Sequence, residues 1–326
     1  MSLDSDLIVD RRRIRRKLTF WRVFSAVILI AAIAVIGVML SPSGRGAFSS
    51  AGSIARVNIE GLIRSDQDRV EALERLANSR AAAVIVHINS PGGTTAGSEQ
   101  LYDALTQLKA KKPLAVVVEG LAASGGYITA IAGDYIVARQ TSLVGSIGVL
   151  FQYPNFTDLL KTVGVQVEEV KSSPLKAAPN GYEPTSPEAR AALDSLVKDS
   201  YAWFRDLVKK RRGMDDALLG KVADGRVFTG HQAIDLKLVD QLGDEKTAIA
   251  WLVAQKGVKA DLPVRDYKLA PRFGDLTFLR TAASITLDAL GMPSIARQIE
   301  RAGGVQAVDR LGLDGMLALW QPAGSH

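Results

Sequence analysis

The side chain with the clearest capacity for chemistry is Ser124, which lies in the stretch Gly120-Leu-Ala-Ala-Ser-Gly-Gly-Tyr-Ile-Thr-Ala-Ile-Ala-Gly133. The apolar residues 114–118 precede it and predict a buried strand, and the small residues that follow allow a tight turn into a helix that begins near Ser124. A hydroxyl at a helix N-terminus lies beside free backbone N–H groups and the positive end of the helix dipole, which favour an oxyanion. Ser124 is therefore a candidate nucleophile, although Ala-Ser-Gly-Gly is also a common composition for a plain turn.

A second glycine-rich corner, Asn89-Ser-Pro-Gly-Gly93, follows the apolar residues 81–88 and precedes a helical pattern with Leu101, Leu105 and Leu108 on one face. Consecutive glycines between a strand and a helix can adopt positive φ and let a ligand approach backbone N–H groups, although an ordinary turn has the same composition. Two such corners in successive βα units lie side by side at one edge of a parallel sheet. The sequence therefore predicts a site where these two corners meet.

Candidate bases for Ser124 are fewer. His87 lies inside an apolar strand and is interpreted as structural, although a pairing of Ser124 with His87 stays open. Lys176 belongs to the loop Lys171-Ser-Ser-Pro-Leu-Lys176, and an isolated lysine in a loop is normally solvated surface. The sequence has no cysteine, and its three histidines (His87, His231 and His326) are too scattered for the close spacing of a zinc site.

The elements that must position these residues alternate between short strands and helices. An N-cap serine, Ser186, followed by proline predicts a long helix that continues to about residue 212. The remaining expected strands are residues 54–60, 135–138, 145–150 and 165–170, and the remaining expected helices are residues 67–79 and 246–255, with a short one between residues 225–230 and 240–243.

An uncharged, almost wholly apolar run occupies residues 23–40. Together with Phe20 and Trp21 it is long enough to cross a hydrocarbon core of roughly 30 Å. Seven basic and three acidic residues precede it, so the net charge of +6 is concentrated there and favours a cytoplasmic flank over nucleic-acid binding. The sequence predicts an uncleaved single-pass anchor, with a cleavable signal peptide as the alternative.

Taken together, the motifs resemble the signal peptide peptidase A family of membrane-anchored serine peptidases, whose fold is shared with the ClpP and crotonase group. The resemblance covers roughly residues 55–260 and rests on Asn89-Ser-Pro-Gly-Gly93, Ala122-Ala-Ser-Gly-Gly-Tyr127, Gly145-Ser-Ile-Gly148, Lys171-Ser-x-x-x-Lys176, and Gly225-Arg-Val-Phe-Thr-Gly230 with Leu238-Val-Asp-x-Leu-Gly243. It implies an α/β domain of repeated ββα units in a spiral behind one N-terminal transmembrane helix.

The resemblance assigns a role to each matching residue. Ser124 becomes the nucleophile and Lys176 its general base, with the Ser146 hydroxyl orienting the lysine amine. Backbone N–H groups of Gly93 and Gly125 form the oxyanion hole, and no cofactor or metal is implied. A lysine with a pKa of about 10.4 is protonated at neutral pH, so a basic Lys176 has to be desolvated and held by neutral hydroxyls.

One part of the pattern departs from the family. The loop before Lys176 reads Ser-Ser-Pro-Leu where the family has more glycine, so the choice of Lys176 over Lys171 is less firmly set than the serine.

The composition and the resemblance together predict the organisation of the whole chain. Its parts are a basic cytoplasmic segment, a transmembrane anchor, a flexible linker, a serine peptidase domain and a C-terminal extension that contacts other subunits: residues 1–22, 23–40, 41–53, 54–262 and 263–326. The implied partners are peptide substrates such as signal-peptide remnants, the bacterial inner membrane, and further copies of the chain in a ring, with the catalytic domain extracytoplasmic. No nucleic acid is expected.

Two other functions remain open at this point. A crotonase-like enzyme acting on acyl-CoA thioesters would use the same paired oxyanion donors without a serine nucleophile, and a membrane scaffold would keep the fold without the chemistry. The extracytoplasmic position argues against the first, and the presence of Ser124 with Lys176 argues against the second.

Overall fold

The computed structural model describes residues 52–269 and 317–320, together with the isolated positions Trp21, Phe24 and Ile28. The chain divides into two units, Met1–Ser50 and Ala51–His326. Apart from Phe24 and Ile28, the predicted span at residues 23–40 lies outside the described residues, as do the basic segment apart from Trp21, almost all of the linker, and most of the C-terminal extension. Among the helices formed by described residues, none is long and apolar enough to cross a membrane.

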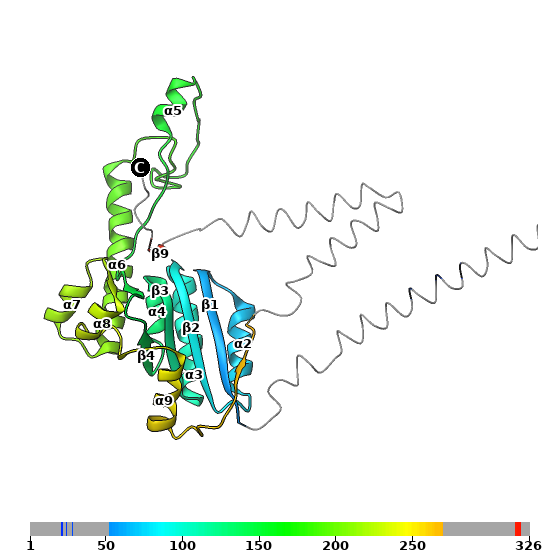
Figure 1. The fold of residues 1–326 in the computed structure, drawn as a ribbon. Coiled ribbons are helices and arrows are strands. Elements are labelled where there is room, and N and C mark those ends of the chain that lie inside the picture. The colour runs from blue at the N-terminus through cyan, green and yellow to red at the C-terminus, as the bar shows by residue number, and fades with distance from the viewer. Residues whose placement is uncertain (1–20, 22–23, 25–27, 29–51, 270–316, 321–326) are drawn as a thin grey trace, which may run out of the picture. The chain divides into compact units, whose positions relative to one another are not determined.

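The second unit is built on a mixed sheet (Figure 1). Its main path runs β6-β5-β3-β2-β1-β8, with β4 and β7 joined beside β3 and with β9 beside β2. The strands are β1 (Ile54–Ile63), β2 (Ala83–Thr94), β3 (Leu114–Ala123), β4 (Tyr135–Ala138), β5 (Leu143–Gly145), β6 (Val227–Thr229), β7 (Gln241–Leu242), β8 (Val264–Asp266) and β9 (Leu317–Leu319).

Helices connect the parallel strands β1, β2 and β3 and cover the sheet (Figure 1). Short polar caps start several of them, as at α6, where the Ser186 hydroxyl accepts the Ala189 N–H at 3.1 Å as the sequence predicted. The helices are α2 (Gln67–Ala77), α3 (Thr95–Lys111), α4 (Gly125–Ala130), α5 (Thr157–Thr162), α6 (Pro187–Arg212), α7 (Asp216–Val222), α8 (Gly230–Asp235) and α9 (Glu245–Lys256).

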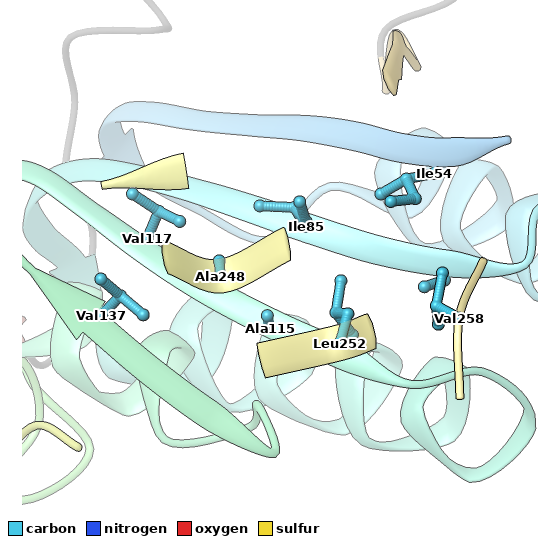
Figure 2. Close-up of a cluster of buried hydrophobic side chains, with 9 residues drawn as sticks. Ile54, Ile85, Ala115, Val117, Val137, Ala248, Leu252 and Val258 are labelled. Carbon is cyan, nitrogen blue, oxygen red and sulfur yellow. The ribbon is translucent and has the colours of Figure 1, made fainter. Parts of the chain in front are cut away.

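The core confirms that β2 and β3 are covered on both faces. Alternate residues such as Ile85 and Val117 point toward α9, where Ala248 and Leu252 pack on them (Figure 2). The residues between them are equally buried, and an added Cβ on Gly133 would lie 2.6 Å from the Val116 side chain. The chain that follows α4 therefore packs on the other face, which explains why both strands read as continuous apolar runs.

Strand β3 carries two neighbours on one of its edges. Residues 115–118 pair with β4, and residues 121–123 pair with β5, both in parallel. The strand runs past Gly120 instead of ending near residue 118, and β2 likewise runs through the predicted Asn89–Gly93 corner. These longer strands carry the sheet directly into the region of the site.

Two predicted strands are wrong. The one expected at residues 145–150 ends at Gly145, because Gly145 and Ser146 have φ values of 101° and 50° that turn the chain out of the ladder. Residues 165–170 form no strand, and Val165 and Val167 are about half exposed. An alternating pattern of apolar and polar residues does not by itself form a strand, and the structure pairs these residues with no other strand among the described residues.

Candidate active site

Ser124 sits at a sharp elbow between β3 and α4. Its backbone has φ 53° and ψ −115°, a conformation that is strained for a residue with a side chain by roughly 1–3 kcal/mol. The elbow is held on both sides: the Ser124 N–H donates to Gly145 O at 2.7 Å, and the Ser124 carbonyl accepts from Tyr127 and Ile128 at 2.9 and 3.0 Å. A strained strand-to-helix turn is the geometry that displays a nucleophilic serine in hydrolases.

The two glycine corners lie side by side, as the sequence predicted. Ser90 of β2 is in register with Ala122 of β3, two residues before Ser124. A Cβ added to Gly126 would lie only 2.6 Å from the Ser90 carbonyl oxygen, so the first turn of α4 rests directly on β2. Glycine is needed at this contact because any side chain would push the two corners apart.

Ser146 is held next to the elbow. It is 7% exposed, has φ 50°, and donates its backbone N–H to Arg226 O at 2.8 Å. The antiparallel pairing of β5 with β6 places Gly145 opposite Val227, and Gly145 is the residue that binds the Ser124 N–H. The motif Gly225-Arg-Val-Phe-Thr-Gly230 therefore positions both serines through β5.

The predicted oxyanion donors lie one at each corner, Gly125 at the start of α4 and Gly93 within β2, where Gly93 is paired with Ile63 of β1 and Ala318 of β9. Gly125 is the first residue of α4. The hydrogen bonds of the helix begin with the N–H groups of Tyr127 and Ile128, so the Gly125 N–H has no acceptor within the helix. Gly93 lies near the end of β2, opposite Ile63 of β1. A Cβ on Gly93 would lie 1.7 Å from Ile63 O, so no side chain fits there.

The lysine loop is the part of the predicted site that the structure does not bring together. Lys176 is exposed, and within the described residues its side chain makes no hydrogen bond or ion pair with Ser124, Ser146 or any other group. Lys171 instead binds the carboxylates of Glu169 and Glu183, each at 2.6 Å. Those hydrogen bonds raise the pKa of Lys171, which makes this lysine the poorer candidate for a neutral base.

His87 is engaged elsewhere. Its Nδ1 lies 2.6 Å from Glu119 Oε1 and its Nε2 lies 2.7 Å from Glu245 Oε2. Arg56 holds the same Glu245 carboxylate through two bonds of 2.6 Å. Both ring nitrogens of His87 are therefore occupied, and the residue is in register with Val117, seven positions before Ser124 on the neighbouring strand. His87 is a structural residue in this arrangement.

Two supports of the elbow were missed in the sequence. The Tyr127 hydroxyl, fully buried, donates to Leu238 O at 2.8 Å, and burial raises the pKa of this phenol. Arg211 of α6 donates to Ile131 O and Gly133 O, both at 2.7 Å, just beyond the C-terminal end of α4. Only the folded chain brings these partners together, although Leu238 belongs to a motif that the sequence did single out.

The described residues contain no group of three histidine, aspartate or glutamate side chains placed to hold a metal ion. The assembled part of the site offers two buried hydroxyls, those of Ser124 and Ser146, and backbone N–H groups at two glycine corners.

Comparison with known proteins identifies two matching families. Residues 106–259 match the model of peptidase family S49, and residues 63–143 match that of Clp protease. The Synechocystis sp. protein named Putative protease slr0021 is 35% identical over 210 residues, which cover 64% of this chain and 76% of that protein. Protease 4 of Haemophilus influenzae is 30% identical over 227 residues, 66% of this chain and 37% of the relative, so the chain spans well under half of that longer protein.

Among solved structures, a single-substitution mutant of the 1510-N membrane-bound stomatin-specific protease is 16% identical, with a TM-score of 0.46 over 68% of this chain and 99% of that one. The sheet topology and the match to Clp protease define a ClpP-like α/β fold with a serine at its elbow. The protein is a serine peptidase. More particularly, it belongs to peptidase family S49, the signal peptide peptidase A family, which separates it from the acyl-CoA enzymes of related fold.

Proposed function

We propose that this protein is a membrane-anchored endopeptidase in which Ser124 and Lys176 form a serine–lysine dyad. The observation that carries the proposal is the Ser124 elbow, which is strained, 1% exposed and braced by β5, α4 and β2. Such strain persists only where the surrounding structure holds it, and it concentrates at functional sites.

In the proposed reaction the Ser124 Oγ attacks the carbonyl carbon of a peptide bond while Lys176 Nζ takes its proton. The N–H groups of Gly93 and Gly125 bind the negative charge that develops on the carbonyl oxygen. Lys176 then returns the proton to the leaving amine, which departs and leaves an acyl-enzyme on Ser124. Water, activated by the neutral amine, hydrolyses the ester and restores the serine.

The base has to reach Ser124 from an exposed turn. Ser146 lies next to the elbow and supplies a neutral hydroxyl that can hold the lysine amine, which is the kind of contact that permits a lowered pKa. Lys171 is tied to two carboxylates and stays an ammonium ion, so Lys176 is the lysine of this loop that is able to move in. Closure of the loop over Ser146 is part of the proposal.

A second copy of the chain is the proposed partner that closes the loop. Around α5 the chain presents apolar side chains to solvent: Phe151, Phe156, Leu159, Val163, Val165, Val167, Val170 and Leu175. A neighbouring subunit of a ring would cover these side chains, which lie on the same segment as Lys176. Light scattering during gel filtration tests this: wild type should be oligomeric, and Leu159→Glu with Val163→Glu should reduce the mass and the reactivity of Ser124 together.

We further propose that residues 23–40 anchor the enzyme in the bacterial inner membrane, with residues 1–22 cytoplasmic and the peptidase domain on the other side. Trp21, Phe24 and Ile28 support this, since they are helical, 43–61% exposed and spaced as one apolar helix face. Remnant signal peptides and other unfolded or membrane-derived peptides are the proposed substrates. Protease protection in inverted membrane vesicles tests the orientation.

The decisive experiment for the dyad is intact-mass spectrometry after exposure to a fluorophosphonate. Wild type should gain a single adduct, and Ser124→Ala and Lys176→Ala should gain none. Lys171→Ala is the matched control, because it removes a lysine from the same loop without removing the proposed base, and it should label as wild type does. An adduct that persists without Lys176, or one that depends on Lys171, would refute the assignment of the base.

A further inference from the structure

The hydroxyl of Ser90 is buried within β2, and the proposed reaction gives it no role. Ser90 is 0% exposed. Its Oγ donates to Gly61 O of β1 at 2.7 Å and accepts the Gly92 N–H at 3.1 Å. Burying a hydroxyl costs free energy unless it is hydrogen-bonded, and this hydroxyl is bonded to the backbone on both counts. Ser90 therefore links β1 to the turn that precedes Gly93.

These hydrogen bonds lie where the pairing of β1 with β2 is interrupted. The register shifts between Glu60 and Leu62, so Ser90 and Pro91 together face the single residue Gly61. Pro91 has no N–H, and a proline within a strand removes a ladder hydrogen bond. The Ser90 hydroxyl supplies a donor to the Gly61 carbonyl at this point, so a side chain replaces backbone pairing at the glycine corner.

The same hydroxyl fixes the peptide unit that carries a proposed oxyanion donor. Gly92 has φ 105°, and glycine has no Cβ to restrict its backbone, so the direction of this turn has to be set by contacts. Ser90 Oγ binds the Gly92 N–H and lies 3.5 Å from the Gly92 carbonyl oxygen. That carbonyl and the Gly93 N–H belong to one planar peptide unit, so they rotate together. Ser90 thus holds the turn that sets the direction of the Gly93 N–H.

Ser90 also contacts the second glycine corner, through its backbone. Its carbonyl oxygen lies 2.6 Å from the position of a Cβ added to Gly126, the residue that follows the other proposed donor, Gly125. In the sheet it is in register with Ala122 of β3. The hydroxyl of Ser90 therefore fixes one corner while its carbonyl supports the other.

We propose that Ser90 is a positioning residue for the oxyanion hole, whose hydroxyl keeps the N–H groups of Gly93 and Gly125 directed at one carbonyl oxygen. The inference rests on the proposed function and adds to it a residue that touches neither the substrate nor the reacting atoms. Oxyanion donors act mainly on the transition state, so a misdirected donor lowers kcat more than it lowers affinity. A displacement of about 1 Å lowers rates by about 100-fold.

The test compares Ser90→Ala and Ser90→Cys with wild type in the full chain. Ser90→Ala removes the hydroxyl, and Ser90→Cys keeps a side chain of similar size but offers only a weak donor and acceptor. Both should lower the rate of fluorophosphonate labelling of Ser124 by at least about tenfold. Both should also lower kcat for a fluorogenic apolar peptide by at least about tenfold, with KM within about twofold of wild type.

Ser142→Ala is the matched control for the loss of a buried serine hydroxyl. Ser142 is 1% exposed, and its Oγ donates to Val118 O at 3.1 Å and to Glu119 O at 2.9 Å instead of to a glycine corner. Its urea midpoint should fall as that of Ser90→Ala does, whereas its labelling rate should stay within about threefold of wild type. The urea titration also shows which variants are folded in the assay, and Ser90→Cys decides if Ser90→Ala is not.

A binding readout that does not depend on catalysis completes the test. In the Ser124→Ala background, a fluorescein-labelled copy of the apolar peptide should bind with and without Ser90→Ala to within about twofold, as measured by fluorescence anisotropy. This result is expected because the bound peptide carries no developing negative charge for the donors to stabilise.

The outcomes separate this inference from the proposed reaction. Labelling of folded Ser90→Ala and Ser90→Cys at the wild-type rate would overturn the inference and leave the reaction intact. An equal loss of labelling in Ser142→Ala, or a peptide affinity that falls as far as the labelling rate, would also overturn it, because Ser90 would then be a general structural residue. A folded wild type that does not label at all would instead refute the reaction, and the inference with it.

Discussion

Replacing Gly126 by alanine tests the contact on which the assembled half of the site depends. Gly126 follows the nucleophile by two residues and has no positive φ, so alanine meets no conformational barrier there. What it meets is the Ser90 carbonyl oxygen, 2.6 Å from the position that the new Cβ would take. Gly220 is the matched control, because it also lies in a short helix and a Cβ there finds nothing within 4 Å.

The size of the effect follows from the distance that has to be gained. Ordinary contact begins near 3.4 Å, so α4 and β2 must separate by about 0.8 Å in Gly126→Ala. Overpacking of this kind destabilises a core by about 1–3 kcal/mol. A displacement of about 1 Å at a reacting group lowers rates by about 100-fold, so the reactivity of Ser124 should fall by at least about tenfold. Gly220→Ala should instead stabilise the protein by roughly 0.5–1 kcal/mol.

Urea denaturation gives the free energy of unfolding of each variant, and the rate of fluorophosphonate labelling gives the reactivity of the serine. The expected pattern is a loss of both in Gly126→Ala and of neither in Gly220→Ala. Labelling of Gly126→Ala at the wild-type rate with unchanged stability would show that α4 does not pack closely on Ser90 of β2 at this position.

Three further predictions concern the supports of the site. Tyr127→Phe should destabilise the protein by about 1–3 kcal/mol, because Leu238 O loses its buried donor, whereas Tyr135→Phe, which removes an exposed hydrogen bond, should stay within about 0.5 kcal/mol in the same urea titration. Arg211→Lys should slow labelling of Ser124, because lysine lacks the planar guanidinium from which Arg211 donates through two separate nitrogens to Ile131 O and Gly133 O, and an unchanged labelling rate would contradict this. The bond to Arg56 lowers the pKa of Glu245 in the folded protein, so its ionised form adds stability above the unfolded pKa of about 4.3, and this stability is lost as the pH falls through the lowered value. Thermal unfolding of Glu245→Gln across neutral to acidic pH should therefore converge on wild type at low pH, and a constant difference would argue against the linkage.

The parts of the fold that the sequence predicted well are those set by local pattern. The apolar runs in β2 and β3 appear as strands buried on both faces, and the cap at Ser186 starts α6 where its chemistry required. The serine elbow was also predictable, because small residues directly after an apolar strand favour a tight turn into a helix. In each case the signal lies within a few residues of the feature that it specifies.

The features that the sequence did not predict depend on residues that are far apart in the chain. Residues 165–170 alternate as a strand does but found no partner among the described residues, and pairing depends on the rest of the chain. The charge network around His87 joins Glu119 and Glu245 from distant elements, so a histidine in an apolar strand gave no sign of it. The insertion of β9 beside Gly93 likewise joins residues more than two hundred positions apart.

The residues that stabilise the fold around Ser124 are different from the lysine that is proposed to activate it. The Ser124 elbow is braced by β2, β5 and α6, all of which also bury core side chains, so substitutions that disturb it should lower stability and reactivity together. Lys176 lies on an exposed turn that contributes little to the core. Changes at Lys176 should therefore alter the reactivity of Ser124 with little effect on the free energy of unfolding. Loss of activity in a fully stable Lys176→Ala protein is the behaviour that this separation requires, and an equal loss of stability in that variant would contradict it.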